Sequence, residues 1–274
     1  MIDRMKIIFI MMLIFVSHFS TASDISNATY TVSTVYKGTL GKSEVTMYLN
    51  VDGEMVSGSY MYDRYKKSIN ITGVKKNNKL ILNEKLINGS AVFTLTLNKN
   101  IYQGEWCYDK CIPIALRFDT SFMEGQIPSV SIKDDDSGTY KLIVSAGEKN
   151  NELIITDSID QPKLDFFDLN NDGFYDLVVR TDIRPNNGSQ VVFISTTNGF
   201  IKDEILSKAN GSFEYDYIDN QVIFSSKEDC CNKYSKDIYY YYGVGFILKD
   251  SLFFDYGIDK GFDKNKKNNF KIVL

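Results

Sequence analysis

The sequence predicts an all-β protein built from short antiparallel strands, and three observations lead to this prediction. Apolar and polar residues alternate with a period of two in many short segments. Turn-forming pairs that contain Asn or Gly separate these segments at intervals of roughly 8 to 12 residues. After the N-terminal segment, no long stretch has the helical periodicity of about 3.6 residues. The pattern is typical of β-sandwiches, β-barrels and β-propellers.

The N-terminal segment 1–22 is predicted to be a secretory signal peptide. The cations Arg4 and Lys6 precede a short apolar run, and small residues lead up to Ala22. The apolar run is shorter than a membrane span requires, and an uncleaved anchor helix is the alternative. We therefore expect cleavage near Ala22 and a periplasmic mature chain, residues 23–274, that is not inserted in a membrane.

The predicted mature chain is acidic and lacks histidine. It holds 29 Lys and Arg against 34 Asp and Glu, and such a surface disfavours binding of nucleic acid or anionic lipid. The only histidine, His18, lies in the signal segment. Without histidine the chain has no Ser-His-Asp or Cys-His site and no ordinary zinc site. We therefore expect a binding protein and not an enzyme.

The first half of the chain is expected to form consecutive β-hairpins. Val45, Met47 and Leu49 alternate with their neighbours, and Asp52-Gly53 is a signal for a two-residue hairpin. Further strands are predicted at residues 56–62, 69–71, 80–82, 93–97 and 114–118, with turns at 77–78, 88–89 and 98–100.

Residues 120–138 lose the alternation, and the two halves of a single all-β domain, 23–274, are expected to meet there. The acidic run Asp134 to Asp136 is interpreted as part of a solvated linker and not as a metal site. In the second half, strands are predicted at residues 141–145, 152–156, 176–182, 190–195, 221–225, 237–242, 246–249 and 252–255.

Four cysteines in an exported chain indicate disulfide bonds. Cys107 and Cys111 flank three residues, whereas Cys230 and Cys231 are adjacent. A bond between adjacent cysteines is strained. Either Cys107 pairs with Cys111, or bonds between the two cysteine pairs link the halves of the chain.

Tyrosine and phenylalanine are abundant, at 18 residues each. Most of them are expected to pack within the sheets. The run Tyr239, Tyr240, Tyr241 and Tyr242 must place two rings on each face of its strand, so part of this run is a candidate interaction surface.

The segment DLNNDGFYD, residues 168–176, is predicted to be a calcium-binding loop. Ca²⁺ takes about six to eight oxygen ligands, and alternate residues of a tight loop can supply them while Gly173 provides the sharp bend. The spacing matches the first nine positions of an EF-hand loop, but Val179 stands where that loop has a bidentate Glu, and the flanks read as strands. We therefore expect a structural Ca²⁺ between two strands, with a hydrated Asx turn as the alternative. The predicted ligands are Asp168, Asn170, Asp172, the backbone carbonyl of Phe174, and Asp176.

Several short motifs precede this loop in a characteristic order. They are Gly58-x-Tyr60-x-Tyr62, Ile69-x-Ile71-x-Gly73, Leu80-x-Leu82-x-Glu84, Phe93-x-Leu95 and Gly104-x-Trp106, followed by DFFDLNNDGFYDLVV. Together they resemble a family of exported bacterial proteins that includes periplasmic immunity proteins of antibacterial secretion systems, related to lysozyme inhibitors. The resemblance covers about residues 40–260 and implies a small β-propeller-like fold with a calcium loop of this type. It also implies a protein that binds and blocks a lysozyme-like effector that cleaves peptidoglycan.

On this interpretation Tyr175 and the Tyr239–Tyr242 run are candidates for contact with the effector, because a tyrosine can hydrogen-bond a catalytic acid while its ring fills a sugar site. Two other functions stay open. The chain could be a calcium-braced exported module that binds glycans or mediates adhesion, or a glycosidase that uses two carboxylates. A β-barrel or a pair of sandwiches is the alternative fold.

Overall fold

The computed structural model describes residues 26–118, 128–134, 139–146, 149–156, 158, 161–182, 187–228, 232–255, 260–263 and 269–271. The predicted signal peptide, most of the predicted linker, Cys230 and Cys231 lie outside these residues. Within them every regular element is a strand, apart from the 3₁₀ turn η2 (Leu206–Lys208), which confirms the all-β prediction. No helix in the described part is long and apolar enough to cross a membrane.

The strands are as follows, in chain order: β1 (Ser26–Asn27), β2 (Tyr30–Leu40), β3 (Ser43–Asp52), β4 (Met55–Tyr62), β5 (Ile69–Lys76), β6 (Lys79–Leu86), β7 (Gly89–Asn98), β8 (Ile101–Cys107), β9 (Cys111–Phe118), β10 (Ser129–Asp134), β11 (Tyr140–Ala146), β12 (Lys149–Ile155), β13 (Lys163–Phe167), β14 (Asp176–Asp182), β15 (Ser189–Thr196), β16 (Gly199–Lys202), β17 (Ser212–Asp216), β18 (Gln221–Lys227), β19 (Lys233–Tyr241), β20 (Phe246–Asp255), β21 (Lys260–Asp263) and β22 (Asn269–Lys271).

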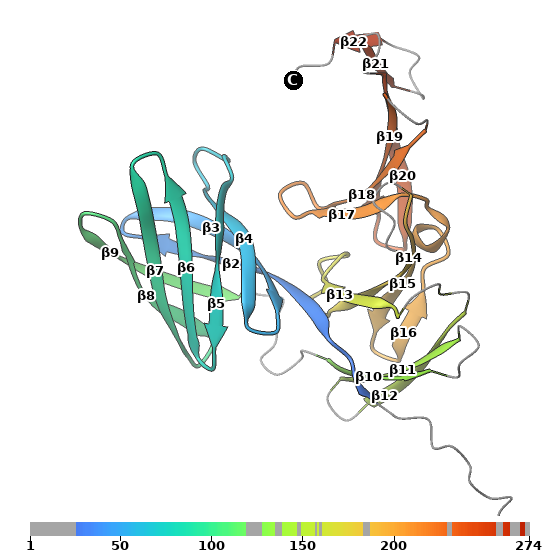
Figure 1. Ribbon diagram of the computed structural model, residues 1–274, viewed down its shortest axis with the longest axis horizontal. Coiled ribbons are helices and arrows are strands. Elements are labelled where there is room, and N and C mark those ends of the chain that lie inside the picture. The colour runs from blue at the N-terminus through green and yellow to red at the C-terminus, as the bar shows by residue number, and fades with distance from the viewer. Residues whose placement is uncertain are drawn as a thin grey trace, which may run out of the picture.

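The first half of the chain forms an eight-stranded closed barrel, β2 to β9 (Figure 1). Each strand pairs with the next as a hairpin, and β9 returns to pair with β2 from Phe118 opposite Tyr36 to Ile114 opposite Leu40. The alternating apolar residues fill its interior, among them the fully buried Leu49. The propeller expectation is wrong for this half, because a continuous meander that closes on its first strand leaves no radial blades. The barrel was the alternative.

Four barrel glycines stand where a neighbouring strand comes very close. At Gly73 of β5, a Cβ atom would lie 2.0 Å from the carbonyl oxygen of Ile81. The other three are Gly38, Gly58 and Gly104, whose Cβ would lie 1.9 or 2.0 Å from a carbonyl oxygen of the adjacent strand. Glycine in a strand allows such a close backbone approach and a tight bend of the sheet.

β2 leaves the barrel at its N-terminal end and joins a second part of the molecule. There its residues Tyr30 to Val32 pair in parallel with Leu164 to Phe166 of β13, and β14, β15 and β16 extend the same sheet. The barrel and β13–β16 therefore belong to one 12-stranded sheet. Figure 1 shows β2, in blue, running from one part to the other.

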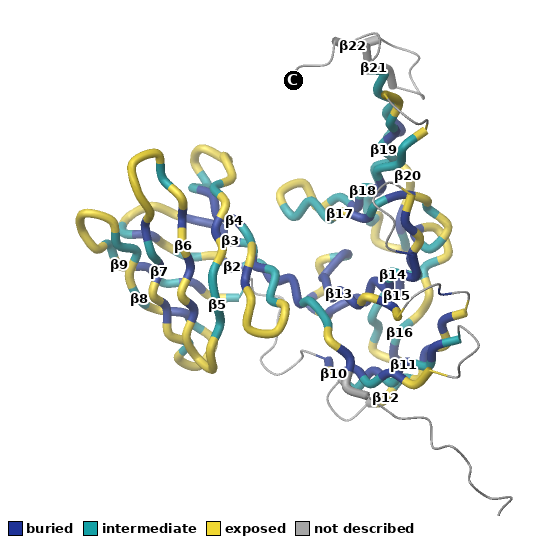
Figure 2. The backbone as a smooth tube through the Cα atoms, viewed as in Figure 1, coloured by how far each residue is buried: buried dark blue, intermediate teal, exposed yellow. Residues whose placement is uncertain are grey.

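The strands β13–β16 form the middle one of three layers. We call the three layers together, β10–β12, β13–β16 and β17–β20, the stack. On one face Leu164 packs into a core shared with β10, β11 and β12, and on the other Phe167 packs into a core shared with β17–β20. Leu177, Val178 and Val179 of β14 are all fully buried. Figure 2 shows β13 and β14 of this layer largely in dark blue. Because both faces are covered, β14 reads as a continuous apolar run and not as an alternation.

The predicted strands 246–249 and 252–255 are in fact one strand, β20. A register shift between Ile238 and Tyr239 of β19 leaves Lys249 of β20 without an opposite residue, since Ile238 faces Asp250 and Tyr239 faces Leu248. This β-bulge absorbs the polar residues that read as a break in the sequence.

Candidate functional site: the aspartate loop, the tyrosine hairpin and the cleft

The aspartate loop, residues 168–176, connects β13 to β14, and its last residue already pairs with Phe167. The loop thus lies between two strands, as its flanks predict. It wraps around the Asp168 carboxylate, which accepts hydrogen bonds from the backbone N–H of Asp172 and of Gly173, both at 3.0 Å. Positive φ angles at Asn171 (57°) and Gly173 (88°) allow the tight turn.

Asp176 ties the loop to the rest of the stack. It is 0% exposed, and its two carboxylate oxygens accept the backbone N–H of Leu169 and of Ser195, each at 2.8 Å. Burial raises the pKa of Asp176 well above its ordinary value, and burial together with the charge of Asp172 raises the pKa of Asp168 to about 6. The loop therefore gathers carboxyl groups in a poorly solvated place, where their ionised form is disfavoured unless a cation balances it.

The oxygens of the loop are compatible with a cation but do not converge into a ready-made cage. Asn170 donates its amide N–H to Asp172 at 3.0 Å, and the Asp168 and Asp176 oxygens already accept backbone N–H groups. Each carboxylate oxygen keeps a further lone pair, so these hydrogen bonds do not prevent coordination. Among the described residues, the group of three acidic or cysteine side chains with all ligand atoms within 4.8 Å is Glu105, Cys107 and Cys111, not the aspartates.

The Glu105 group is not a metal site, because its cysteines are bonded to each other. Cys107 and Cys111 stand opposite one another at the ends of β8 and β9 and form a disulfide. The pairing of Cys107 with Cys111 was one of the two predicted alternatives. Cys230 and Cys231 lie outside the described residues.

Tyr175, predicted to contact a partner, is an interior residue. Its side chain is 4% exposed, and its hydroxyl shares a 2.7 Å hydrogen bond with the Thr34 hydroxyl of β2. Burial raises the pKa of Tyr175 to about 12. The residue joins the aspartate loop to β2, and this position does not suit a partner contact.

Three tyrosines of the run lie in β19 and divide between its two faces, whereas the prediction placed two rings on each face of a strand that included Tyr242. Tyr239 and Tyr241 pack in the core of β17–β20. On the other face the Tyr240 hydroxyl accepts hydrogen bonds from Gln221 at 2.7 Å and from Lys249 at 2.8 Å. These three rings are held by the sheet, and only the fourth tyrosine of the run extends beyond β19.

The hairpin end that follows β19, residues 242–245, is apolar, exposed and ordered, and we call it the β19–β20 tip. Tyr242 is 75% exposed and Val244 is 97% exposed. The Tyr242 N–H donates to the Gly245 carbonyl at 2.9 Å, and Gly243, with φ 72°, accepts a hydrogen bond from the Tyr241 hydroxyl. The apolar surface continues into Ile247 and Leu248, which are about half exposed.

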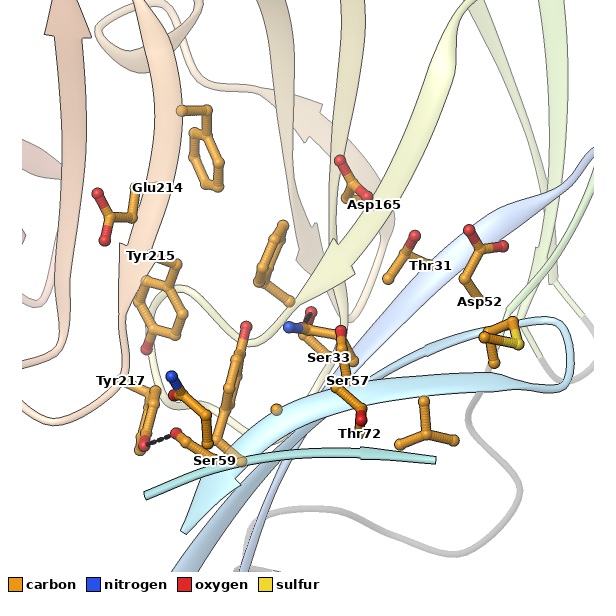
Figure 3. Close-up of a pocket in the computed structure, with 18 of the residues that line it drawn as sticks. Thr31, Ser33, Asp52, Ser57, Ser59, Thr72, Asp165, Glu214, Tyr215 and Tyr217 are labelled. Atoms are coloured by element: carbon orange, nitrogen blue, oxygen red, sulfur yellow. Dashed lines mark hydrogen bonds between the residues drawn. The ribbon is translucent and has the colours of Figure 1, made fainter. Parts of the chain in front are cut away.

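A cleft of about 750 Å³ lies between the outer wall of the barrel and the stack (Figure 3). Tyr217, in the turn between β17 and β18, reaches the barrel wall, where its ring stacks on Tyr48 at 4.3 Å and its hydroxyl hydrogen-bonds Ser59 at 2.7 Å. Beyond this contact a smaller hollow of about 430 Å³ extends to Asp168 and Asn171 of the aspartate loop. Sequence reasoning missed the cleft, because residues from distant parts of the chain line it.

No protein-family model and no curated protein matches the sequence.

Proposed function

We propose that the chain is an exported, non-catalytic inhibitor that binds a lysozyme-like effector through the β19–β20 tip and protects the cell from peptidoglycan cleavage. The observation that carries the proposal is the tip itself, a short ordered hairpin end with an exposed tyrosine and an exposed valine. Tyrosine is among the residues that contribute most to protein interfaces. A hairpin end that is already ordered loses little entropy on binding.

The chemistry of the tip suits the cleft of a peptidoglycan-cleaving enzyme. Such a cleft holds carboxyl groups beside sugar sites, and a tyrosine can donate its hydroxyl hydrogen to a carboxylate while its ring covers an apolar sugar face. The acidic mature chain also favours encounter with a basic enzyme.

Val244→Asp tests the role of the tip, because a buried charge without a partner weakens an interface. We expect it to lower the affinity for the cognate effector at least about tenfold, or about 1.4 kcal/mol. Ile87→Asp is the matched control, since Ile87 is also an apolar, fully exposed residue of a hairpin end (101%). Affinity is measured by calorimetry, and protection by survival of cells that carry the chain in the periplasm. Equal affinities for the two variants would refute the role of the tip.

We also propose that the aspartate loop holds a structural Ca²⁺ ion. The ligands would be Asp168, Asn170, Asp172, the backbone carbonyl of Phe174, and Asp176. Buried negative charge and an all-oxygen donor set support this assignment. The ion would neutralise that charge and stiffen the loop.

A further inference from the structure

The cleft has a polar wall formed by the barrel. Since the apolar residues of the barrel strands point inward, alternate positions of β2 to β5 present short polar side chains to the cleft. Figure 3 shows hydroxyl groups of this wall facing the cleft. The wall includes Thr31, Asn50, Ser57, Ser59, Asn70 and Thr72.

The other wall, formed by the stack, is aromatic. The Phe167 and Phe213 rings pack at its base in a tilted arrangement with centroids 5.3 Å apart, and the Tyr215 ring packs edge-on to Phe167 at 5.8 Å. Tyr217 closes one end through its stack with Tyr48. A ligand in the cleft would thus meet rings on one side and hydroxyl and amide groups on the other.

The described residues that line the cleft give it no net positive charge, since they include two cations and three anions. The Arg180 guanidinium forms an ion pair with Asp165, with Nε to Oδ2 at 2.6 Å, and also lies over the Phe213 ring. The remaining charged lining residues are exposed. They are Asp52, Lys163 and Glu214.

The walls are held in place before any ligand arrives. β2 runs through both parts of the molecule, and Tyr217 bonds to Ser59 across the gap. The Tyr215 hydroxyl donates to the Asp168 carbonyl at 3.0 Å, which fixes that ring to the aspartate loop. A preorganised site avoids part of the entropy cost of binding, and its volume is within the range of about 300–1,000 Å³ found for ligand pockets.

We propose that this cleft binds a short, uncharged oligosaccharide. A pyranose ring has an apolar C–H face that packs against an aromatic ring, as the wall of the stack offers. Its rim of hydroxyls exchanges hydrogen bonds with amides and hydroxyls, as the barrel wall offers. Of the two lining cations, Arg180 is paired with Asp165, and Lys163 is outnumbered by Asp52 and Glu214, so the lining does not favour an anionic ligand. This site is separate from the β19–β20 tip and does not depend on the proposed inhibitory function.

The test is an NMR titration of the whole mature chain with cellotriose, maltotriose and chitotriose, with trigalacturonate as the anionic probe. We expect at least one neutral trisaccharide to bind with Kd of about 1 mM or tighter and trigalacturonate to bind more weakly. If no neutral trisaccharide binds, or if trigalacturonate binds most tightly, the proposal is wrong.

Four variants locate the binding. Asn70→Ala should weaken it about fivefold through loss of a hydrogen bond, whereas Asn83→Ala, at an equally exposed asparagine of β6 outside the cleft, should leave it unchanged. Tyr217→Ala should weaken it at least about tenfold, and Tyr217→Phe, which keeps the ring, should restore it. Binding that persists in both Asn70→Ala and Tyr217→Ala would place the sugar elsewhere and overturn the assignment.

The two proposals fail separately. Val244→Asp should weaken inhibition of an effector and keep sugar binding, whereas Asn70→Ala should weaken sugar binding and keep inhibition. Release of shortened sugars from any trisaccharide would contradict a purely binding role for the cleft.

Discussion

At the scale of single residues, the aspartate loop depends on a few oxygens whose environment the sequence only partly predicts. The spacing of Asp168, Asp172 and Asp176 predicts a tight loop between strands, and the structure has that loop. The direction of Tyr175 was not predictable, because its hydroxyl partner Thr34 lies 141 residues away along the chain. Whether a residue next to a strand points inward depends on what covers that strand.

Calcium is expected to stabilise the wild-type chain and to lose this effect when a loop ligand is removed. At a Ca²⁺ concentration of about 100 times Kd, binding adds about 2.7 kcal/mol to the free energy of unfolding. The melting temperature should therefore be higher in Ca²⁺ than in chelator for the wild type and equal in both for Asp172→Ala.

Asp216→Ala is the matched control for calcium, since Asp216 also leads a tight turn, where its carboxylate accepts the N–H of Ile218 at 2.9 Å. This variant should keep the calcium-dependent shift. A wild-type melting temperature that does not respond to Ca²⁺ contradicts the metal proposal.

The buried Tyr175 should make the fold sensitive to alkaline pH. Its folded-state pKa, about 12, is above the value of about 10 for an exposed tyrosine. Its contribution is therefore complete below pH 10 and is lost as the pH rises towards 12, by at most about 2.7 kcal/mol. Urea unfolding at a series of pH values should show that the free energy of unfolding falls less between pH 10 and 12 for Tyr175→Phe than for the wild type. The same fall in both proteins would contradict this account.

At the scale of elements, the local sequence pattern predicts strands and hairpins well, but it does not predict how the strands curve and close into a barrel. Alternation and turn pairs identify β3 to β7, because one face of each strand packs inside the barrel and the other does not. The same signals misplace a break within β20, where a bulge accommodates Lys249 and Asp250. The same polar residue types occur at turns and at β-bulges, so composition alone does not distinguish a turn from a bulge.

The barrel glycines lead to a prediction about strand curvature. Gly73→Ala places a Cβ atom 2.0 Å from a backbone carbonyl that belongs to β6, and backbone cannot move aside as a side chain can. We expect a loss of about 3 kcal/mol or more in the free energy of unfolding. Gly53→Ala is the control. It has no atom within 4 Å of the added Cβ and meets only the strain of φ 57°, about 1–2 kcal/mol. Equal losses in urea unfolding would show that β5 can shift away from β6.

At the scale of the whole molecule, the arrangement depends on pairings between distant segments. The barrel closes through the pairing of β9 with β2, and the pairing of β13 with the other end of β2 joins the stack to the barrel. No local pattern specifies either register, so the sequence predicts the class of the fold but not the barrel, the stack or the cleft between them. The residues of the cleft are ordinary outward-facing positions until the two parts are placed together.

The double membership of β2 also bears on the order in which the parts of the chain fold. All the strands of the barrel precede residue 119, so it can close while the later segments are still being synthesised. During that interval the segment from Tyr30 to Val32 lacks its β13 neighbour and presents bare backbone amides and carbonyls. Folding therefore passes through a stage that is vulnerable to aggregation and proteolysis, and this stage ends when residues 164–166 pair with β2.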